Sequence, residues 1–252
     1  DAKLNQMQNF RRLMNYGMYG PKSPATNILT ETELQTMDPQ ELTDRIHNQN
    51  SYKHRIMYYG PTSEKELLAI INKNHQAPKK LKEIPVGNEF PRLETPVTKV
   101  LISPYEAKQI YMTQLSNRGE KFDPMIEPSR QMYNEYFGGG MNSIVFQEMR
   151  ESRGLAYSAW AGLNRPSYSK YPYLLQTQIA TQNDKMIDAI KVFNDIIDNM
   201  PESEAAFQLA KEALIARLRT ERITKSDIIW SYINAQDLGQ NVDSRIKLYN
   251  DA

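Results

Sequence analysis

The order of secondary-structure patterns in the second half of the chain most constrains its fold. Residues 157–162 and 173–181 carry the aromatic and β-branched residues that predict strands. Apolar residues then recur at helical spacing over residues 186–197 and, after Pro201, over residues 207–218. Two consecutive strands followed by two long helices favour an α+β fold, with a mainly antiparallel sheet and helices packed on one face.

Earlier segments extend this pattern. We expect strands over residues 97–103 and 107–116, joined as a hairpin at Pro104-Tyr105, and helices over residues 124–137, 142–152 and 226–238. The glycines Gly138, Gly139 and Gly140 separate the first two of these helices, and we interpret them as a hinge. The alternative is an anion-binding loop, but these glycines follow a helix and lack the lysine of a phosphate-binding loop.

The first 76 residues carry a separate series of patterns. They predict helices over residues 2–15, 39–47 and 63–72 and a strand over residues 54–59. Residues 77–96 contain four prolines, which hold the backbone extended and remove hydrogen-bond donors. We therefore interpret residues 77–96 as a linker, residues 1–76 as the end of a preceding domain, and residues 97–252 as one α+β domain. The chain opens directly in a helical pattern and ends without a cap, so we expect a piece of a longer protein.

Composition excludes several classes of function. Lysine and arginine (31) nearly balance aspartate and glutamate (30), so the net charge of +1 gives no general attraction to nucleic acid or to an anionic membrane. The chain has no cysteine, which excludes disulfides, thiolate metal sites and cysteine nucleophiles. No apolar run approaches the roughly 18 residues that a membrane span needs, so we expect no such span. These features leave the cellular compartment open.

The sequence also lacks the motifs of common catalytic sites. Its three histidines, His47, His54 and His75, do not occur in the zinc-binding patterns His-x-x-Glu-His, His-Glu-x-x-His or His-x-x-x-His. We therefore expect this chain to bind no metal of its own. The Gly-x-Ser-x-Gly motif of serine hydrolases, the P-loop and the dinucleotide fingerprint are absent as well.

One stretch carries a specific resemblance. Residues 137–158 have the sequence Phe-Gly-Gly-Gly-Met-Asn-Ser-Ile-Val-Phe-Gln-Glu-Met-Arg-Glu-Ser-Arg-Gly-Leu-Ala-Tyr-Ser. This stretch resembles the C-terminal domain of M16 (pitrilysin-like, inverzincin) metallopeptidases, which carries a glycine-rich turn, a helix start, and then Leu-Arg followed by Gly-Leu-Ala-Tyr-Ser. Residues 38–75 resemble the helix, strand and helix that precede the interdomain linker in this family. The resemblance therefore covers nearly the whole chain.

The resemblance implies a tandem of similar α+β domains, in which zinc is bound by an N-terminal domain that this chain lacks. It implies that this chain is the C-terminal part of a zinc metalloendopeptidase, inactive alone, and that residues 1–76 end the preceding M16-like domain. The zinc-carrying domain would belong to the same chain or to a partner chain. Peptides or unfolded proteins would be the substrates, and a dimer is one assembly consistent with the family.

The resemblance also assigns two donors to the substrate side of the zinc site, an arginine and a tyrosine seven positions apart that match Arg150 and Tyr157. A guanidinium and a phenol both suit the oxyanion that forms when zinc-bound water attacks a peptide carbonyl. Arg150 is expected to end a helix, Gly154 to reverse the chain and Tyr157 to begin a strand, so that both side chains reach one cleft. The alternatives are an Arg150 paired with a nearby glutamate and a Tyr157 in the core.

Other residues near the motif have two interpretations. Arg153 competes with Arg150, but its place beside Gly154 favours the surface. Tyr168 and Tyr171 are interpreted as substrate-binding residues that line a peptide groove, and an amphipathic rim over the core explains them equally well. For the whole protein, the alternative to a peptidase is a non-catalytic M16-like subunit that binds peptides or scaffolds an assembly. A stand-alone α+β interaction domain is a third hypothesis.

Overall fold

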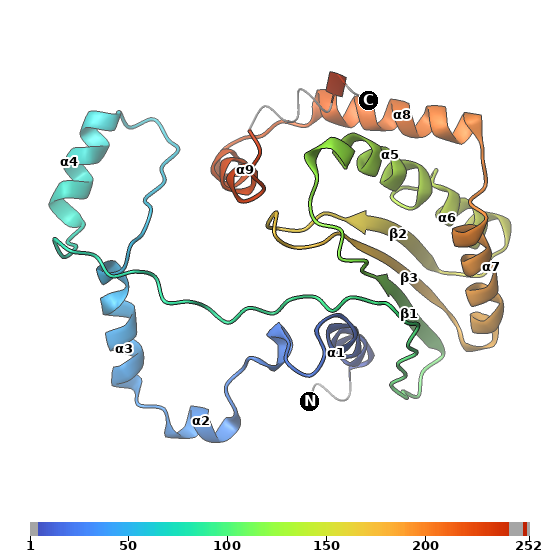
Figure 1. The fold of residues 1–252 in the computed structure, drawn as a ribbon, viewed down its shortest axis with the longest axis horizontal. Coiled ribbons are helices and arrows are strands. Elements are labelled where there is room, and N and C mark those ends of the chain that lie inside the picture. Colours follow the sequence, from blue (N-terminus) through green and yellow to red (C-terminus); the bar gives the residue numbers. More distant parts are fainter. Residues whose placement is uncertain (1–4, 242–248, 251–252) are drawn as a thin grey trace.

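The computed structural model describes residues 5–241 and 249–250, and these form an antiparallel sheet with helices around it (Figure 1). The sheet contains β1 (Gln109–Ser116), β2 (Ser158–Asn164) and β3 (Leu174–Gln182). Its order is β1-β3-β2, so the last strand in the sequence is central and pairs with both others in antiparallel register. The predicted α+β class with an antiparallel sheet is confirmed.

Helices that precede and follow the strands cover one face of the sheet. Three elements lie against β2, namely the helices α5 (Glu127–Phe137) and α6 (Ile144–Phe146) and the π-helical turn η5 (Gln147–Ser152). The helix α7 (Met186–Asp198) lies against β3, and α8 (Glu204–Thr220) packs on α5. The side chains of Val145, Met149, Ile179 and Phe193 are fully buried between these layers. Burial of an apolar side chain of this size contributes roughly 1.5–3 kcal/mol, so this face holds the core.

The helix α1 (Gln6–Tyr19) lies over the opposite face of the sheet, near β1. Its Phe10 ring is 5.6 Å from the ring of Tyr111, which points away from the core because neighbouring strand residues alternate and Met112 packs in the core. The structure confirms residues 6–15 of the predicted first helix and extends the helix past Gly17 to Tyr19. Gly20, with a φ of +75°, caps its end. Residues 2–4 of that prediction lie outside the described residues.

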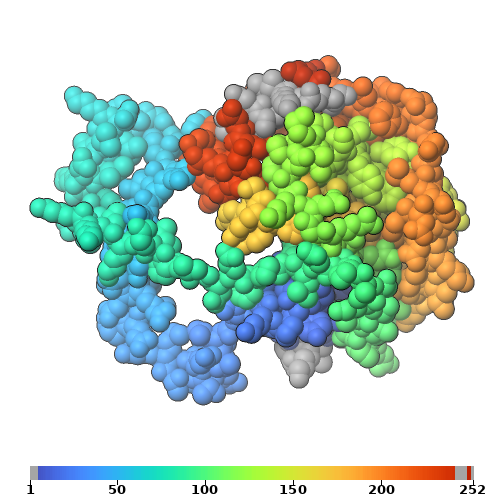
Figure 2. Space-filling model, in the orientation of Figure 1, coloured from blue at the N-terminus to red at the C-terminus, as the bar shows by residue number. Residues whose placement is uncertain are grey.

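Residues 27–86 form an arm that leaves the sheet (Figure 1). After the short turn η2 (Pro24–Thr26), the arm contains α2 (Glu31–Thr36), α3 (Pro39–His47), η3 (Asn48–Ser51) and α4 (Glu64–Asn74). Figure 2 shows an open gap between the arm and the rest of the molecule. Near its outer end the arm meets α9 (Ser226–Asp237), where the Arg55 guanidinium donates to the Gln236 side-chain oxygen at 2.9 Å.

Local capping explains the helices of the arm. The Asp38 carboxylate accepts from the Gln40 N–H at 2.9 Å, and Ser63 and Glu66 form a reciprocal capping box at the start of α4. Both predicted helices are confirmed. The predicted strand at residues 54–59 is wrong: this segment lies in the arm, far from the sheet, and has no strand to pair with.

The predicted hairpin before β1 is also wrong. Residues 97–103 form no strand, and the side chains of Val100 and Ile102 are both 80% exposed. The described strand partner of β1 is β3, through its residues 175–182, and β1 forms the edge of the sheet. Residues 83–96 run without helix or strand, and Leu93 and Thr95 tie them to α1 and to the end of β1 through backbone hydrogen bonds. The boundaries of the linker and of the two domains stay predictions.

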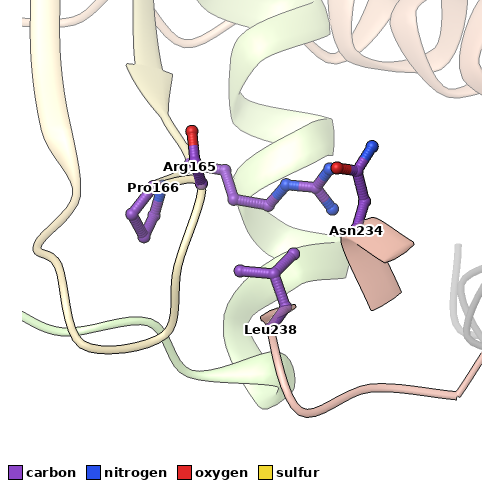
Figure 3. Close-up of a pocket in the computed structure, with 5 residues that line it drawn as sticks. Arg165, Pro166, Asn234 and Leu238 are labelled. Carbon is purple, nitrogen blue, oxygen red and sulfur yellow. The ribbon is translucent and has the colours of Figure 1, made fainter. Parts of the chain in front are cut away.

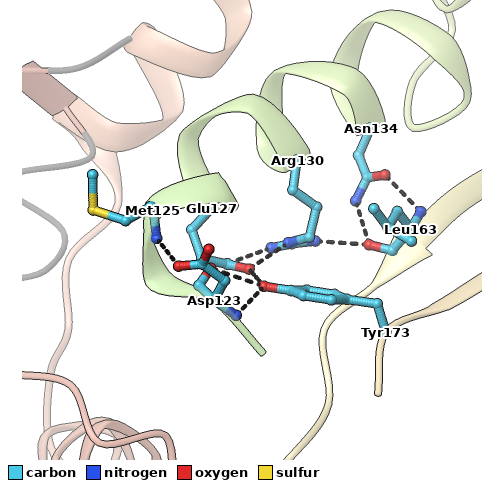
Figure 4. Close-up of polar contacts among 7 residues, drawn as sticks. All are labelled: Asp123, Met125, Glu127, Arg130, Asn134, Leu163 and Tyr173. Carbon is cyan, nitrogen blue, oxygen red and sulfur yellow. Dashed lines mark hydrogen bonds and ion pairs between the residues drawn. The ribbon is translucent and has the colours of Figure 1, made fainter. Parts of the chain in front are cut away.

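A buried polar cluster closes the outer edge of β2 (Figure 4). The Leu163 carbonyl accepts from Arg130 at 2.9 Å and from Asn134 at 3.2 Å, and the Leu163 N–H donates to Asn134 at 2.8 Å. Arg130 also forms a two-pronged ion pair with Glu127, whose carboxylate accepts from the Tyr173 hydroxyl at 2.9 Å. The helix α5 thus satisfies the backbone groups that an edge strand would otherwise expose.

Tyr173 makes the stability of the protein sensitive to high pH. Burial, and then the hydrogen bond to the Glu127 carboxylate, raises the pKa of Tyr173 to about 12. The unfolded chain releases this proton near pH 10, whereas the folded protein keeps it. The stabilisation is therefore complete below pH 10 and is lost as the pH rises toward 12.

We expect the melting temperature of Tyr173→Phe to decrease less above pH 10 than the melting temperature of the unaltered protein. Tyr168→Phe, which removes a hydroxyl from a half-exposed ring, is the matched control. Thermal unfolding followed by circular dichroism from pH 8 to pH 12 checks the result. An unchanged slope in Tyr173→Phe would contradict the assignment.

Candidate functional site

The glycine-rich turn brings α5 close to the sheet. A Cβ atom on Gly138 would lie 2.2 Å from the Ala161 carbonyl oxygen of β2, and one on Gly139 would lie 2.7 Å from the Asn134 carbonyl oxygen. Glycine is therefore needed here because two backbones approach each other closely. This is a packing role, and the hinge role of Gly138, Gly139 and Gly140 stays a prediction.

The turn after these glycines positions Arg150. The Ser143 hydroxyl caps α6, and the helix then widens into the π-helical turn η5 that contains Arg150. Such widened turns are rare and occur often at functional sites. The Arg150 guanidinium lies 5.0 Å from the centre of the Phe146 ring and 3.6 Å from the Glu151 carboxylate, with its side chain 49% exposed. Phe146 was not predicted as a neighbour of Arg150, although the i, i+4 spacing of the two residues is a signal for it.

A tight reversal connects Arg150 to β2. Gly154 has a φ of +55° and donates to the Arg150 carbonyl at 3.1 Å, and the N–H groups of residues 155 and 156 both donate to the Met149 carbonyl. The Tyr157 N–H then donates to Ala180 at 2.8 Å and enters the sheet. The predicted order of helix end, glycine reversal and strand start is confirmed, and it sets Tyr157 beside the turn that carries Arg150.

Both predicted donors are at the surface. Tyr157 is 75% exposed, which rules out the alternative of a core tyrosine, and its hydroxyl makes no hydrogen bond to any described residue. Arg150 does pair with a neighbouring glutamate, but an ion pair this exposed is worth little and leaves the guanidinium accessible. Arg153 pairs with Glu148 at 3.2 Å on the surface, as expected.

The structure does not bring the two predicted tyrosines of the β2–β3 loop near Arg150. Tyr168 and Tyr171 contact each other edge to face, with ring centres 5.9 Å apart, and Lys170 lies over Tyr171. They follow the end of β2, whereas Tyr157 precedes its start, and seven strand residues at ~3.3 Å each separate the two ends by roughly 23 Å. Their substrate-binding role stays a prediction that requires an extended substrate.

A small pocket lies between this loop and α9 (Figure 3). Its volume is about 190 Å3, and it is lined by Arg165, Pro166, Ser167, Asn234 and Leu238. The Arg165 side chain extends across the pocket toward Asn234. The pocket is at the same end of β2 as Tyr168 and does not include the predicted catalytic residues.

The described residues contain no group of three or more histidine, cysteine, aspartate or glutamate side chains arranged to hold a metal ion. That this chain has no zinc-binding site of its own nevertheless stays a prediction. Across residues 5–241 and 249–250, no helix is both long enough and apolar enough to cross a membrane.

Solved structures with the same fold include M16 proteins. A peptidase M16 inactive domain from Pseudomonas fluorescens aligns with 99% of this chain and 59% of its own length, with a TM-score of 0.67 and 15% identity. The ferredoxin protease FusC, solved as an E83A mutant with Arabidopsis ferredoxin, aligns with 99% of this chain and 27% of its own length, with a TM-score of 0.66 and 11% identity. These likenesses show the fold.

Sequence comparison points the same way. An uncharacterized zinc protease of Mycobacterium bovis is 34% identical over 80 residues, which are 31% of this chain and 18% of that protein. This chain thus spans less than two thirds of the length of this relative and of the two solved structures above. The family model of the peptidase M16 inactive domain matches residues 55–214, a range that includes Arg150 and Tyr157. Because that match covers more than half of the sequence, the chain belongs to the M16 peptidase family, as an inactive-type domain.

Proposed function

We propose that this chain is the half of an M16 zinc metalloendopeptidase that lacks the catalytic zinc motif. In this proposal a second domain binds zinc, and Arg150 and Tyr157 reach the substrate near the bond that is cleaved. Both groups can donate hydrogen bonds, and the guanidinium is also positively charged, so they stabilise the negative charge that develops on the carbonyl oxygen. Zinc would supply the activated water, and this chain alone would be inactive.

The observation that carries the proposal is the exposure of these two donors on either side of one chain reversal. Tyr157 exposes 75% of its surface, more than any other described tyrosine, and its hydroxyl makes no hydrogen bond to a described residue. The adjacent π-helical turn and the close approach at Gly138 hold Arg150 on a rigid support.

The substrate in this proposal is a peptide or an unfolded protein in extended form. The solved FusC structure holds ferredoxin, which is a protein ligand for a relative of this fold. A segment of about seven extended residues would span from Tyr157 to the tyrosines of the β2–β3 loop. Tyr168 and Tyr171 would then contact the substrate at a distance from the cleaved bond.

The alternative is a non-catalytic M16-like subunit. A chain in a structure of Complex III2 from Candida albicans has the same fold, with a TM-score of 0.58 over 100% of this chain and 62% of its own length, at 14% identity. The fold therefore also occurs within a large assembly. In this alternative, Arg150 and Tyr157 would bind a peptide without any cleavage.

Cleavage assays on the complete protein, with this half and the half that precedes it, separate the two functions. We expect the complete protein to cleave an unstructured peptide and to lose this activity when a chelator removes zinc, with recovery after zinc is added back. The isolated 252-residue chain is the matched control and should not cleave. A complete protein that binds the peptide but leaves it intact would support the non-catalytic subunit instead.

A further inference from the structure

Two histidines that are far apart in the sequence meet in the arm. The Nε2 atoms of His54 and His75 lie 2.7 Å apart, and their ring planes are inclined by 75°. Neither residue belongs to the candidate site around Arg150. We propose that this pair, the His54–His75 pair, binds one borderline divalent transition-metal ion such as Zn²⁺, with water completing the coordination.

The protonation of His54 favours metal binding. Its Nδ1 atom lies 2.6 Å from the Tyr52 carbonyl oxygen, which can only accept a hydrogen bond, so Nδ1 carries the proton of the neutral ring. The Nε2 atom of His54 therefore presents a lone pair toward His75. A histidine ligand commonly donates its second ring nitrogen to a backbone carbonyl in this way, which fixes the orientation of the ring.

Backbone hydrogen bonds hold each histidine independently of the other. His75 directly follows α4, and its N–H donates to the Ile71 carbonyl at 2.7 Å. His54 follows a short bridge in which Lys53 donates to Lys82, and Lys82 donates to Ser51, both at 2.8 Å. The two rings therefore meet because the backbone places them there, and little ordering remains to be done when an ion binds.

A metal ion requires only a small change in the separation of the two nitrogens, and the two exposed rings turn so that both Nε2 lone pairs point at it. Two nitrogens at ~2.0–2.1 Å from one ion lie about 2.9 Å apart at a right angle and about 3.3 Å apart in a tetrahedron, compared with 2.7 Å between the two Nε2 atoms here. The His75 proton moves from Nε2 to Nδ1 through solvent, so both ligands stay neutral and no net proton is released. His54 is exposed and His75 is half-exposed, so water has access to the remaining positions.

The site would be weak and exchangeable. Because the described residues offer no third histidine or acidic side chain at this place, it lacks the closed ligand set of a structural zinc site. Imidazole pairs suit Zn²⁺, Ni²⁺ and Cu²⁺ rather than Mg²⁺ or Ca²⁺. A bound ion would join residues 52–54 to the end of α4 and thereby brace the arm. This site departs from the sequence-based expectation that the chain binds no metal of its own. It is separate from the zinc of the proposed peptidase centre, and it does not depend on the proposed function.

The three histidines of the chain provide a complete set of variants. The purified chain, freed of metal with a chelator, is titrated with ZnCl₂ by isothermal titration calorimetry. We expect one exchangeable Zn²⁺ per chain in the unaltered protein and in His47→Ala, since His47 ends α3 and takes no part in the pair. We expect loss of this binding in His54→Ala and in His75→Ala.

Conservative variants and folding controls make each outcome decisive. His54→Gln and His75→Gln keep a polar side chain of similar length, and circular dichroism melting establishes that each variant folds. Addition of MgCl₂ in place of ZnCl₂ should give no binding heat. The proposal is wrong if the unaltered chain takes up no Zn²⁺, or if folded His54→Gln and His75→Gln both retain it.

Discussion

Tyr157→Phe is expected to lower kcat for peptide cleavage by the complete protein by roughly 10² to 10³-fold, which is the scale for losing one donor to an oxyanion. Only a hydroxyl is removed, and that hydroxyl bonds to no described residue, so the fold loses no internal contact. KM should change much less than kcat, because the donor acts on charge that develops in the transition state. Steady-state cleavage of one peptide by both proteins, with melting temperatures, provides the measurement.

Arg150→Ala is expected to lower kcat/KM at least as much, since it removes a full positive charge together with the guanidinium that lies over the Phe146 ring. Arg153→Ala is the matched control: it lies three residues further along, exposes a similar fraction of its side chain and pairs with Glu148 on the surface. It should change kcat/KM little. If Tyr157→Phe cleaves at the unaltered rate, or if Arg153→Ala is the more damaging arginine variant, the two donors have been assigned wrongly.

Arg130→Ala is expected to destabilise the protein by about 3–5 kcal/mol, the cost of leaving one partner of a buried ion pair without its counter-charge. The side chains of Arg130 and Glu127 are only 11% and 8% exposed, and Arg130 also donates to the Leu163 carbonyl at the edge of β2. Asn134 keeps its bonds to Leu163, so the edge itself stays partly satisfied. Urea denaturation followed by circular dichroism measures the change in the free energy of unfolding.

A second variant tests whether Arg130→Ala loses stability because the buried Glu127 carboxylate is left without its counter-charge. The double variant Arg130→Met and Glu127→Leu removes both charges and keeps the volume apolar, so it should recover much of the stability lost in Arg130→Ala. Arg153→Ala, which breaks an exposed ion pair, should cost less than about 1 kcal/mol. A loss as small in Arg130→Ala as in Arg153→Ala would show that the buried pair contributes little.

Local signals in the sequence predicted the helices well. Capping residues such as Asp38 and Ser63 act within one turn, and the apolar spacing of residues 186–197 specifies a helix face without reference to distant segments. The stretch 137–158 was sufficient to indicate the family, and the match of the family model to residues 55–214 confirms it. The reversal at Gly154 was also predictable from local sequence, because a residue with positive φ between a helix and a strand is most often glycine.

Strands were predictable only where a partner existed. Residues 54–59 and 97–103 have strand-like composition as β2 and β3 do, but a strand is stabilised by hydrogen bonds to another strand, and the sequence does not state which segments will be neighbours. The arm carries the first of these segments away from the sheet. The second runs with Val100 and Ile102 exposed and forms no strand beside β1, although β1 is at the edge of the sheet.

The sequence by itself determined the local elements, the family and the identity of the two candidate donors. Only the tertiary structure decided which side chains are buried and which distant residues meet. Glu127 and Arg130 are three residues apart and look like an ordinary surface pair, yet the approach of Tyr173 and Leu163 buries them. His54 and His75 share no spacing motif, and they meet because the chain folds back between η3 and the end of α4. Burial and long-range contacts depend on how elements pack, and packing is a property of the whole chain rather than of any short stretch of it.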